Sequence, residues 1–373
     1  MKTIGLLGST GSIGRNVLAV VNNAPDAFSV TYMTANTQVE RLAAQAREFR
    51  PQTAVIGDES KYPELQRRLA GSGIATAAGY DNIVALAGET EVDVVVNAIV
   101  GSAGLRPTLA AAEQGRDIAL SNKESLVMAG ELINRVCKRT GATLYPVDSE
   151  HSAIWQCMAG ESGKDVEKIV LTGSGGPFLR RELSTFNDIT PAEALKHPNW
   201  SMGAKITVDS STMVNKGLEL IEAYHLFHLP PARIDILIHP ESIVHSMVQF
   251  RDGSLKAQLG VPDMKVPIQY ALAYPRHLHS DWPRLDLAAT GTLHFEEPDT
   301  RRFPALVLAR QVLEQGGTYP AVFNAANEAA VRKFLEGTLT FPGITDAVKA
   351  ALDRHEPLDP LDMDNILTIA GMP

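Results

Sequence analysis

The chain has 373 residues, of which 45% are hydrophobic and 21% charged, an ordinary composition for a globular enzyme of two or three domains. The formal net charge is −9 and no block of basic residues occurs, which excludes nucleic acid as an expected partner. No apolar run approaches bilayer-spanning length, and no signal or transit peptide precedes the first predicted strand. Two cysteines are too few for a disulfide framework, so we expect a cytoplasmic protein without membrane contact.

A glycine-rich loop lies near the start of the sequence. A short apolar strand is predicted at 3–7, and the loop 8–14 leads from it into a helix. Its three glycines form a variant of the dinucleotide-binding fingerprint: Gly8 permits the tight turn, Gly11 lets the backbone approach a pyrophosphate, and Gly14 lets the helix pack on the strand. The alternative is a plain strand–helix turn.

Strands and helices alternate through the first 145 residues. The apolar patterns predict the following strands and helices: strands at 28–34, 54–56, 92–96, 117–120 and 142–145, and helices at 39–49, 62–69, 105–114 and 124–139. The Val-rich run at 92–96 is typical of a strand buried on both faces. This alternation predicts a Rossmann-like, doubly wound parallel sheet.

The end of the second predicted strand bears on the choice of cofactor. NAD-binding domains place an acid there to hold the ribose 2′-hydroxyl, but this chain has Asn36, Thr37 and Gln38. The absence of a carboxylate favours NADP. Arg41, one helical turn further on, is the nearest cation for a 2′-phosphate; alternatively, it is a solvated helix residue.

Charged residues follow two later strands of this sheet. Lys123 and Glu124 come after the strand at 117–120, at the edge where α/β sheets bind ligands, although such a pair also occurs at ordinary helix starts. Asp148 and Glu150 follow the strand at 142–145, and two positions apart on extended backbone they point the same way. Two such carboxylates indicate a hard-cation site; the alternative is a solvated turn with one capping acid.

The segment 173–203 links a predicted strand to a polar stretch without strong periodicity, and glycines lie at both of its ends. Long loops of this kind are often lids. Trp200 and Met202 are large apolar side chains within it. A flexible lid over the reacting centre is therefore expected, with a surface loop held by one tryptophan as the alternative.

The stretch after this loop contains the densest set of polar side chains. Asn215, Lys216 and Glu219 fall three or four positions apart on a predicted helix and so share a neighbourhood. With Ser210, Asn215 and Lys216 offer the hydroxyl, amide and cation that bind a phosphate monoester. Glu219 is a candidate third carboxylate for the cation site. The alternative is a salt-bridged helix surface.

The remaining sequence predicts an antiparallel sheet with strands at 234–238, 242–250 and 254–259, followed by helices from about residue 303. His239 and His245 are expected to be structural rather than metal ligands. The predicted division is a nucleotide-binding domain at 1–147, a central α+β catalytic domain at 148–275 with the lid at 173–203, a linker at 276–300, and a C-terminal helical bundle at 301–373.

Several motifs resemble one family, 1-deoxy-D-xylulose 5-phosphate reductoisomerase, in order along the whole chain. They are the segments 8–14, 122–126, 146–151, 172–178, 197–203, 208–219, 239–245 and 323–328. The resemblance implies NADPH- and metal-dependent conversion of 1-deoxy-D-xylulose 5-phosphate to 2-C-methyl-D-erythritol 4-phosphate, an early step of the non-mevalonate route to isoprenoids. It also implies a homodimer, with Mg²⁺ or Mn²⁺, and Co²⁺ as a further candidate.

The resemblance implies roles for individual residues. The metal ligands are expected to be Asp148, Glu150 and Glu219, which with Lys123 make the catalytic group. Substrate contacts are expected from Lys123, Glu124, Ser149, Glu150, Ser174, His197, Trp200, Ser210, Asn215, Lys216 and Glu219. Cofactor contacts are expected from Gly8, Thr10, Gly11, Ser12, Ile13, Asn36, Thr37, Gln38, Asn122, Glu124, Met202 and Gly203.

Thr37 departs from the family pattern, because a basic residue is common at that position. Two other functions stay open from the residues themselves. An NADP-dependent dehydrogenase of a small phosphorylated substrate, without isomerisation, would not need three convergent carboxylates. A non-catalytic nucleotide sensor would bind NADPH without oxidising it.

Overall fold

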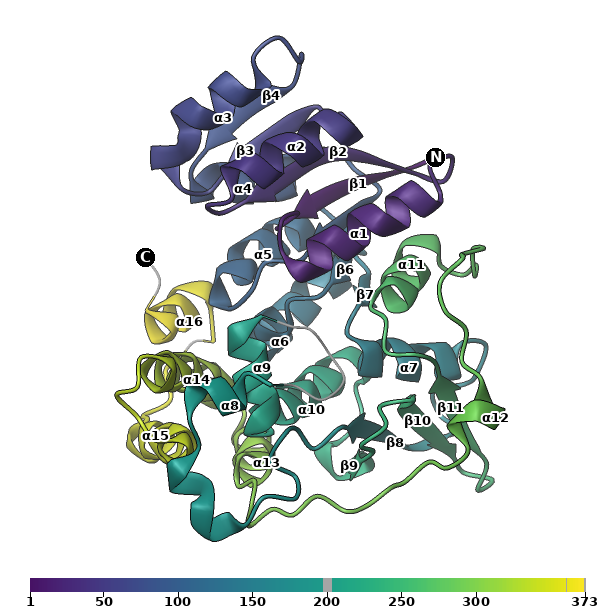
Figure 1. Cartoon of the computed structure of the whole chain (residues 1–373), viewed down its shortest axis with the longest axis vertical. Helices are drawn as coiled ribbons and strands as arrows, with labels where there is room; N and C mark the ends of the chain where they lie inside the picture. The colour runs from purple at the N-terminus through teal and green to yellow at the C-terminus, as the bar shows by residue number, and fades with distance from the viewer. Residues whose placement is uncertain (197–202, 360, 372–373) are drawn as a thin grey trace. The chain divides into compact units, whose positions relative to one another are not determined.

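The computed structural model describes residues 1–196, 203–359 and 361–371 (Figure 1). The chain forms two compact units. The first comprises Met1–Ser125, Ile133–Asp148 and Met264–Asp281, and the second Leu126–Leu132, Ser149–Asp263 and Trp282–Pro373. The segment Met264–Asp281 thus belongs to the first unit, whereas the sequence pattern predicts a central domain that extends to residue 275.

The first unit is built on a seven-stranded parallel sheet. Its strands are β1 Lys2–Leu7, β2 Phe28–Ala35, β3 Thr53–Ile56, β4 Ala75–Ala78, β5 Val94–Asn97, β6 Asp117–Leu120 and β7 Leu144–Pro146. The spatial order is β4-β3-β2-β1-β5-β6-β7, so the direction of winding reverses at β1. The predicted doubly wound sheet is confirmed, and the reversal places its ligand-binding crevice at the carboxyl ends of β1 and β5.

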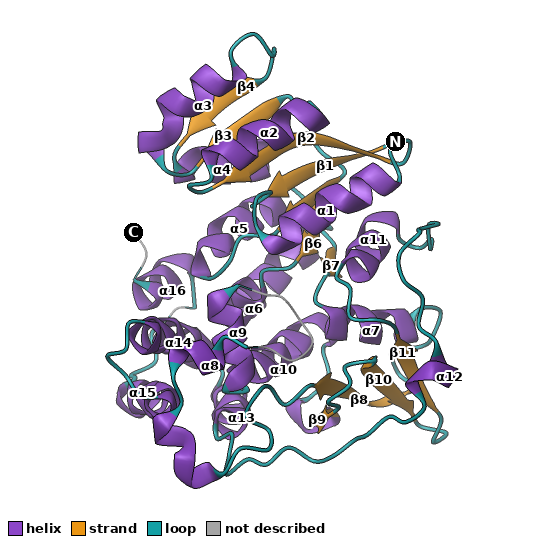
Figure 2. Ribbon diagram, viewed as in Figure 1, coloured by secondary structure: helices purple, strands orange, loops and turns teal. Residues whose placement is uncertain are grey.

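Helices connect these strands and cover both faces of the sheet. They are α1 Ser12–Asn23, α2 Val39–Phe49, α3 Tyr62–Leu69, α4 Tyr80–Glu89, α5 Leu105–Glu113, α6 Lys123–Thr140 and α11 Lys265–Ala273, with short 3₁₀ turns at Glu59–Lys61 and Ser102–Gly104. Because parallel connections are right-handed, the helices before and after the reversal lie on opposite faces. Figure 2 shows α1 and α2 crossing one of these faces.

The second unit contains a four-stranded sheet with strands β8 Val166–Gly173, β9 Ile234–Ile238, β10 Val244–Phe250 and β11 Leu255–Leu259. The order is β11-β10-β8-β9. β10 pairs antiparallel with both β8 and β11, but β8 pairs parallel with β9. The expectation of a purely antiparallel sheet is therefore wrong, because a long helical crossover returns the chain beside β8 in the same direction.

The helices of the second unit follow the same chain order. They are α7 Ser149–Met158, α8 Pro191–Ala194, α9 Ala204–Ser211, α10 Val214–Phe227, α12 Leu287–Thr290, α13 Ala305–Gln315, α14 Tyr319–Leu335, α15 Phe341–Arg354 and α16 Met363–Ala370, with 3₁₀ turns at Leu183–Asp188 and Pro231–Arg233. One face of the sheet, with α7, α10 and α13, forms the main apolar core. The helices predicted from about residue 303 onward are confirmed, and the first of them, α13, begins at Ala305.

Several short elements were not predicted, namely β4, α4, α8, α9, α11 and α12. β4 reads Ala-Thr-Ala-Ala and has no strong apolar alternation, and it is an edge strand. α11 carries Pro267 in its first turn, where a missing N–H is tolerated. Among the residues that the structure describes, no helix is both long and apolar enough to cross a membrane.

Candidate active site

The glycine loop between β1 and α1 has strict steric requirements at two positions. Gly8 has a φ of +81°, and a Cβ there would lie 2.7 Å from the Ala98 carbonyl oxygen. A Cβ at Gly14 would lie 2.3 Å from the Gly8 carbonyl oxygen. At Gly11 a Cβ would meet only Gly8 O, at 3.5 Å, so the fold itself does not require glycine there. That difference is typical of a loop whose middle glycine leaves room for a ligand.

The loop is also tied to the neighbouring strand and helix. Thr34 on β2 accepts a hydrogen bond from Gly8 N through Oγ1 at 3.1 Å, and Arg41 Nη1 on α2 donates to the Thr10 carbonyl at 3.3 Å. Asn36, Thr37 and Gln38 are all exposed after β2. Arg41 is thus an exposed residue whose guanidinium reaches the glycine loop.

Asn122 organises the loop after β6. Its side-chain oxygen accepts from Ser125 N and caps α6, and its amide nitrogen donates to the carbonyls of Ile99 and Gly101 and to Glu124. A Cβ on Gly104 would collide with this side chain at 2.4 Å. Asn122 is thus fully buried and holds together two loops at the carboxyl ends of β5 and β6.

Lys123 and Asp148 form an ion pair at the edge of the first unit. Lys123 is 4% exposed, while the Asp148 side chain is 17% exposed. A nearly buried ammonium and a partly accessible carboxylate place one cation and one acid where β6 and β7 end. Part of the Asp148 carboxylate is therefore accessible to a cation or a polar ligand.

Glu150 and Glu219 in the second unit are joined by Lys216. Lys216 Nζ donates to Glu150 Oε1 at 2.8 Å and to Glu219 Oε2. Ser149 Oγ donates to the other Glu150 oxygen at 2.6 Å, and Asn215 Nδ2 donates to the other Glu219 oxygen. The two carboxylates come from α7 and α10 and meet around a single ammonium.

Glu150 lies inside α7, which begins at Ser149. The expectation that Asp148 and Glu150 point the same way from one stretch of extended backbone is therefore wrong. Helical backbone turns successive side chains by about 100°, so the orientation of Glu150 is set by α7 and not by the strand before it.

Lys216 is charged in its buried position. Burial lowers the pKa of its ammonium, but the carboxylates of Glu150 and Glu219 outweigh that effect, and the net shift is upward. Its side chain lies over the end of β8, where a Cβ on Gly173 would be 2.9 Å from Lys216 Cε. Two carboxylates and one ammonium leave a net charge of −1 in this buried site, so the ammonium compensates only one of the acids, and removing it would leave both uncompensated.

Several side chains expected to hold a phosphate gather around the end of β8. Gly176 has a φ of +68°, and a Cβ there would lie 2.8 Å from the Ser210 carbonyl oxygen. Ser174 Oγ accepts from Gly176 N at 3.2 Å, so this side chain belongs to the same turn. The turn of β8 thus packs on the end of α9, with Lys216 over Gly173. The structure thus places the turn that contains Ser174 beside the Ser210 backbone and the Lys216 side chain, although these segments lie about 40 residues apart in sequence.

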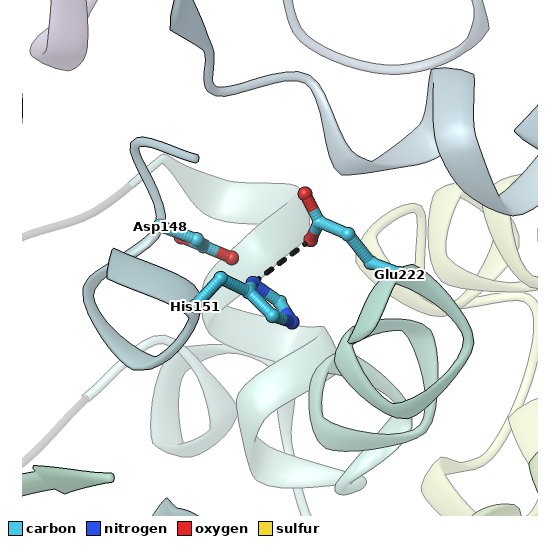
Figure 3. A group of neighbouring side chains, drawn as sticks. All are labelled: Asp148, His151 and Glu222. Atoms are coloured by element: carbon cyan, nitrogen blue, oxygen red, sulfur yellow. Dashed lines mark ion pairs between the residues drawn. The ribbon is translucent and has the colours of Figure 1, made fainter. Parts of the chain in front are cut away.

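His151 and Glu222 form a buried pair that was not predicted (Figure 3). His151 Nδ1 lies 3.3 Å from Glu222 Oε2, and both side chains are essentially inaccessible. The other ring nitrogen lies 2.9 Å from the Glu219 carbonyl oxygen, which only accepts, so Nε2 carries a proton. His151 therefore fixes α10 at Glu219. Its place in the 146–151 motif and the i,i+3 spacing of Glu219 and Glu222 were the available signals.

His239 and His245 behave as expected of structural histidines. His239 Nε2 accepts from the backbone N–H groups of Ile243 and Val244, each at 3.1 Å, and Nδ1 donates to the His294 carbonyl at 2.8 Å. Both nitrogens are therefore occupied. Burial lowers the pKa of His245, which favours a neutral ring.

The middle of the predicted lid is packed rather than free. Phe178, Phe186, Ile189 and Ala194 are buried in one cluster with residues of α14 and α15. The expectation that this segment offers little apolar surface is wrong, because aromatic side chains spaced along a polar sequence escape a periodicity test. His197, Trp200 and Met202 lie outside the described residues, and Gly203 is the exposed N-cap of α9.

The first unit combines a parallel sheet with a glycine loop. In the second unit, a buried acidic cluster lies beside Lys216 and the turn that contains Ser174. Together these features define a nucleotide-dependent oxidoreductase of the α/β class. Three family models match the chain in order. They are described as 1-deoxy-D-xylulose 5-phosphate reductoisomerase at residues 4–130, the C-terminal domain of that enzyme at 144–227, and DXP reductoisomerase C-terminal domain at 259–372.

The chain belongs to the 1-deoxy-D-xylulose 5-phosphate reductoisomerase family. It is 50% identical over 369 residues to the enzyme of that name from Chloroherpeton thalassium, covering 99% of this chain and 95% of the relative. The corresponding enzyme from Bacteroides thetaiotaomicron is 48% identical over 353 residues, covering 95% and 90%. The predicted reductoisomerase activity is confirmed, and a dehydrogenase without isomerisation is set aside.

Solved structures agree with this assignment. The Zymomonas mobilis reductoisomerase in complex with NADPH superposes with a TM-score of 0.93 at 44% identity, covering 99% of this chain and 96% of that one. A reductoisomerase in complex with NADPH, fosmidomycin and magnesium superposes with a TM-score of 0.95 at 41% identity, covering 100% and 96%.

Proposed function

We propose that the first unit binds NADPH through the glycine loop, with Gly8, Thr10, Gly11, Ser12 and Ile13 around the pyrophosphate. The support is steric and electrostatic. Gly11 has no fold requirement for glycine, and the first backbone N–H groups of α1 offer a positive helix terminus to the phosphates.

The 2′-phosphate of the cofactor is assigned to the residues after β2. Asn36, Thr37 and Gln38 are exposed polar side chains without a carboxylate to repel the phosphate. Arg41 is the cation already anchored beside the glycine loop by its bond to Thr10 O. With one monodentate cation and no basic residue at 37, the preference for NADPH over NADH is expected to be moderate.

We assign the divalent metal to Asp148, Glu150 and Glu219, with Mg²⁺ or Mn²⁺ as the ion and Co²⁺ as a further candidate. The donor set fits, because three carboxylates are oxygen ligands of the kind these ions take. When bound, the metal stabilises negative charge that develops on the substrate oxygens. Lys123, paired with Asp148, and Glu124 beside it are assigned to the reacting part of the substrate, with Ser149 at the start of α7.

The substrate phosphate is assigned to Ser174, Ser210, Asn215 and Lys216, with His197 and Trp200 contributing from the segment that is not described. Lys216 can then pair either with the carboxylates of Glu150 and Glu219 or with the substrate phosphate. While it bridges Glu150 and Glu219, it occupies the position between those carboxylates that a shared cation would take. A cation held by those carboxylates would displace the ammonium, and Lys216 would then be available to the phosphate, so the two binding events would be coupled.

The observation that carries the proposal is the Lys216 bridge between Glu150 and Glu219 at the end of β8. The experiment is NADPH oxidation with 1-deoxy-D-xylulose 5-phosphate, followed by absorbance at increasing Mg²⁺, alongside Mn²⁺ binding measured by electron paramagnetic resonance. Turnover should rise with occupancy of one Mn²⁺ site. Metal-independent turnover, or Mn²⁺ binding that survives Glu219→Gln unchanged, would contradict the metal assignment.

The lid is proposed for the segment 173–203, of which residues 197–202 lie outside the described part of the chain. Arg181 is held by Glu193 at 2.7 Å and stacks on Phe178 at 5.6 Å, whereas Lys196 is exposed. Trypsin should therefore cut at Lys196 before Arg181. Addition of NADPH, Mg²⁺ and a phosphonate inhibitor should slow cleavage at Lys196; equal rates with and without ligand would make the segment a structural loop.

A homodimer is proposed, as the family resemblance implies. The outer face of the four-stranded sheet is hollowed by a cavity of about 480 Å³, lined by Val170, Leu237, Met247 and Leu255 among others. Polar side chains, among them Lys168, Asp235 and Arg310, share this lining, and a concave surface of mixed apolar and charged character suits a second copy of the chain. Light scattering should give a dimer that Leu255→Glu weakens, and a monomeric wild type would contradict this. The cytoplasm is the proposed location.

A further inference from the structure

The 323–328 motif on α14 has no part in the proposed active site, yet it contains two fully buried amides, Asn324 and Asn327. Asn327 Nδ2 donates to Asp209 Oδ1 on α9 at 2.8 Å, across 118 positions of sequence. This bond ties the C-terminal helices to the helix that carries Ser210.

Asp209 is a buried carboxylate, 1% exposed, with two partners. Lys205 Nζ, one turn earlier on α9, lies 2.9 Å from Oδ2, and Asn327 supplies the donor for Oδ1. A carboxylate oxygen left without a donor in such a place costs more than the bond itself contributes. The hydrogen bond from the Asn327 amide therefore fixes the position of the Asp209 side chain.

The other half of the Asn327 amide argues for a role beyond packing. Its Oδ1 is buried and has no hydrogen-bond partner within the described part of the chain. A buried, unsatisfied acceptor typically costs about 1–3 kcal/mol. An apolar side chain would avoid that cost on a helix face that only packs. Unlike an apolar side chain, the Asn327 amide donates a directed hydrogen bond to Asp209.

The orientation of α9 matters because Ser210 is next to Asp209 and its backbone is in contact with the turn after β8. A Cβ on Gly176 would lie 2.8 Å from Ser210 O, so little play exists between them. We propose that Asn327, through Asp209, fixes α9 so that Ser210 faces the substrate phosphate, which makes Asn327 a positioning residue. This inference rests on the phosphate site proposed above.

The test is Asn327→Asp, which sets two carboxylates against each other at the present donor–acceptor contact. We expect the KM for 1-deoxy-D-xylulose 5-phosphate to rise at least about tenfold, with kcat within about threefold, because the Ser210 contact to the phosphate is the same in the ground and transition states. The Kd of inorganic phosphate, measured by calorimetry, should rise in parallel. The swapped pair Asp209→Asn with Asn327→Asp restores one donor and one acceptor and should recover most of the loss.

Two controls separate positioning from general damage. Asn324 Nδ2 donates to Glu328 Oε1 at 3.1 Å within α14. Asn324→Asp therefore places a second carboxylate beside Glu328 and leaves the bond between α14 and α9 unchanged. Its KM should stay within about twofold, and Mn²⁺ affinity should be unchanged in both variants. Asn327→Ala carries the same test if the acidic variant does not fold.

Ser210→Ala tests the phosphate site separately from the positioning role of Asn327. If Ser210→Ala leaves phosphate affinity unchanged, the phosphate site itself is misassigned. If Ser210→Ala weakens phosphate binding but Asn327→Asp does not, or if the swapped pair fails to recover it, the positioning role of Asn327 is overturned.

Discussion

The glycine loop of the first unit and the Glu150–Lys216–Glu219 cluster of the second differ in what holds them in place. The loop is fixed by the absence of side chains, since Cβ atoms at Gly8 and Gly14 would collide with backbone. The cluster is fixed by the attraction of two carboxylates to one ammonium in a buried site, which keeps a net charge of −1. The steric site has one arrangement, whereas the charged site can take another once a different cation binds.

The largest effect is expected from breaking the charged cluster at Glu219. Glu219→Gln keeps the size of the side chain but removes a ligand charge where charge develops in the reaction. Losing one such group typically costs about 10²–10³ in kcat, measured by NADPH oxidation at saturating Mg²⁺. Glu161→Gln, at an exposed pair with Lys256, is the matched control. Near-normal activity of Glu219→Gln at low Mg²⁺ would remove Glu219 from the metal site.

The steric site should respond differently at its different glycines. Gly14→Ala forces a Cβ against backbone atoms and should lower the free energy of unfolding by about 2–3 kcal/mol, measured by urea denaturation. Gly11→Ala, whose Cβ has room in the fold, should leave stability unchanged and weaken NADPH binding. Equal stability losses in the two variants would mean that Gly11 is a folding residue.

Lys216→Gln sharpens the comparison because the loss of this buried side chain is expected to strengthen metal binding. Removing the ammonium leaves Glu150 and Glu219 without their internal cation, so Mn²⁺ affinity should increase by about tenfold, in line with about 1.4 kcal/mol of lost competition. Phosphate affinity should fall in the same variant. Weaker Mn²⁺ binding in Lys216→Gln would show that the lysine supports the metal site instead of competing for it.

The smallest effect is expected at Arg41, at the margin of the steric site. Arg41→Ala should reduce the ratio of kcat/KM for NADPH over NADH by about fivefold, as expected for one exposed charged contact. Arg47→Ala, on the same helix but remote from the glycine loop, should leave the ratio unchanged. An unaltered ratio in Arg41→Ala would assign the 2′-phosphate to Asn36–Gln38 alone.

Local patterns in the sequence determined much of this protein. The alternation of apolar segments predicted the doubly wound sheet, and the glycine spacing predicted the loop, because both follow from backbone geometry over a few residues. The i,i+3 and i,i+4 spacing predicted that Asn215, Lys216 and Glu219 share a neighbourhood. The ordered motifs predicted the family, since their residue types recur over the whole chain.

Only the tertiary structure decided which distant groups share a buried site. The meeting of Glu150 with Lys216, the His151–Glu222 pair and the Asn327–Asp209 bond each join segments more than 60 residues apart. No local pattern records them, because buried charges and amides choose partners by proximity in the folded core. The packed aromatic residues of the expected lid, Phe178 and Phe186, escaped prediction for the same reason: the surface that buries them comes from helices α14 and α15.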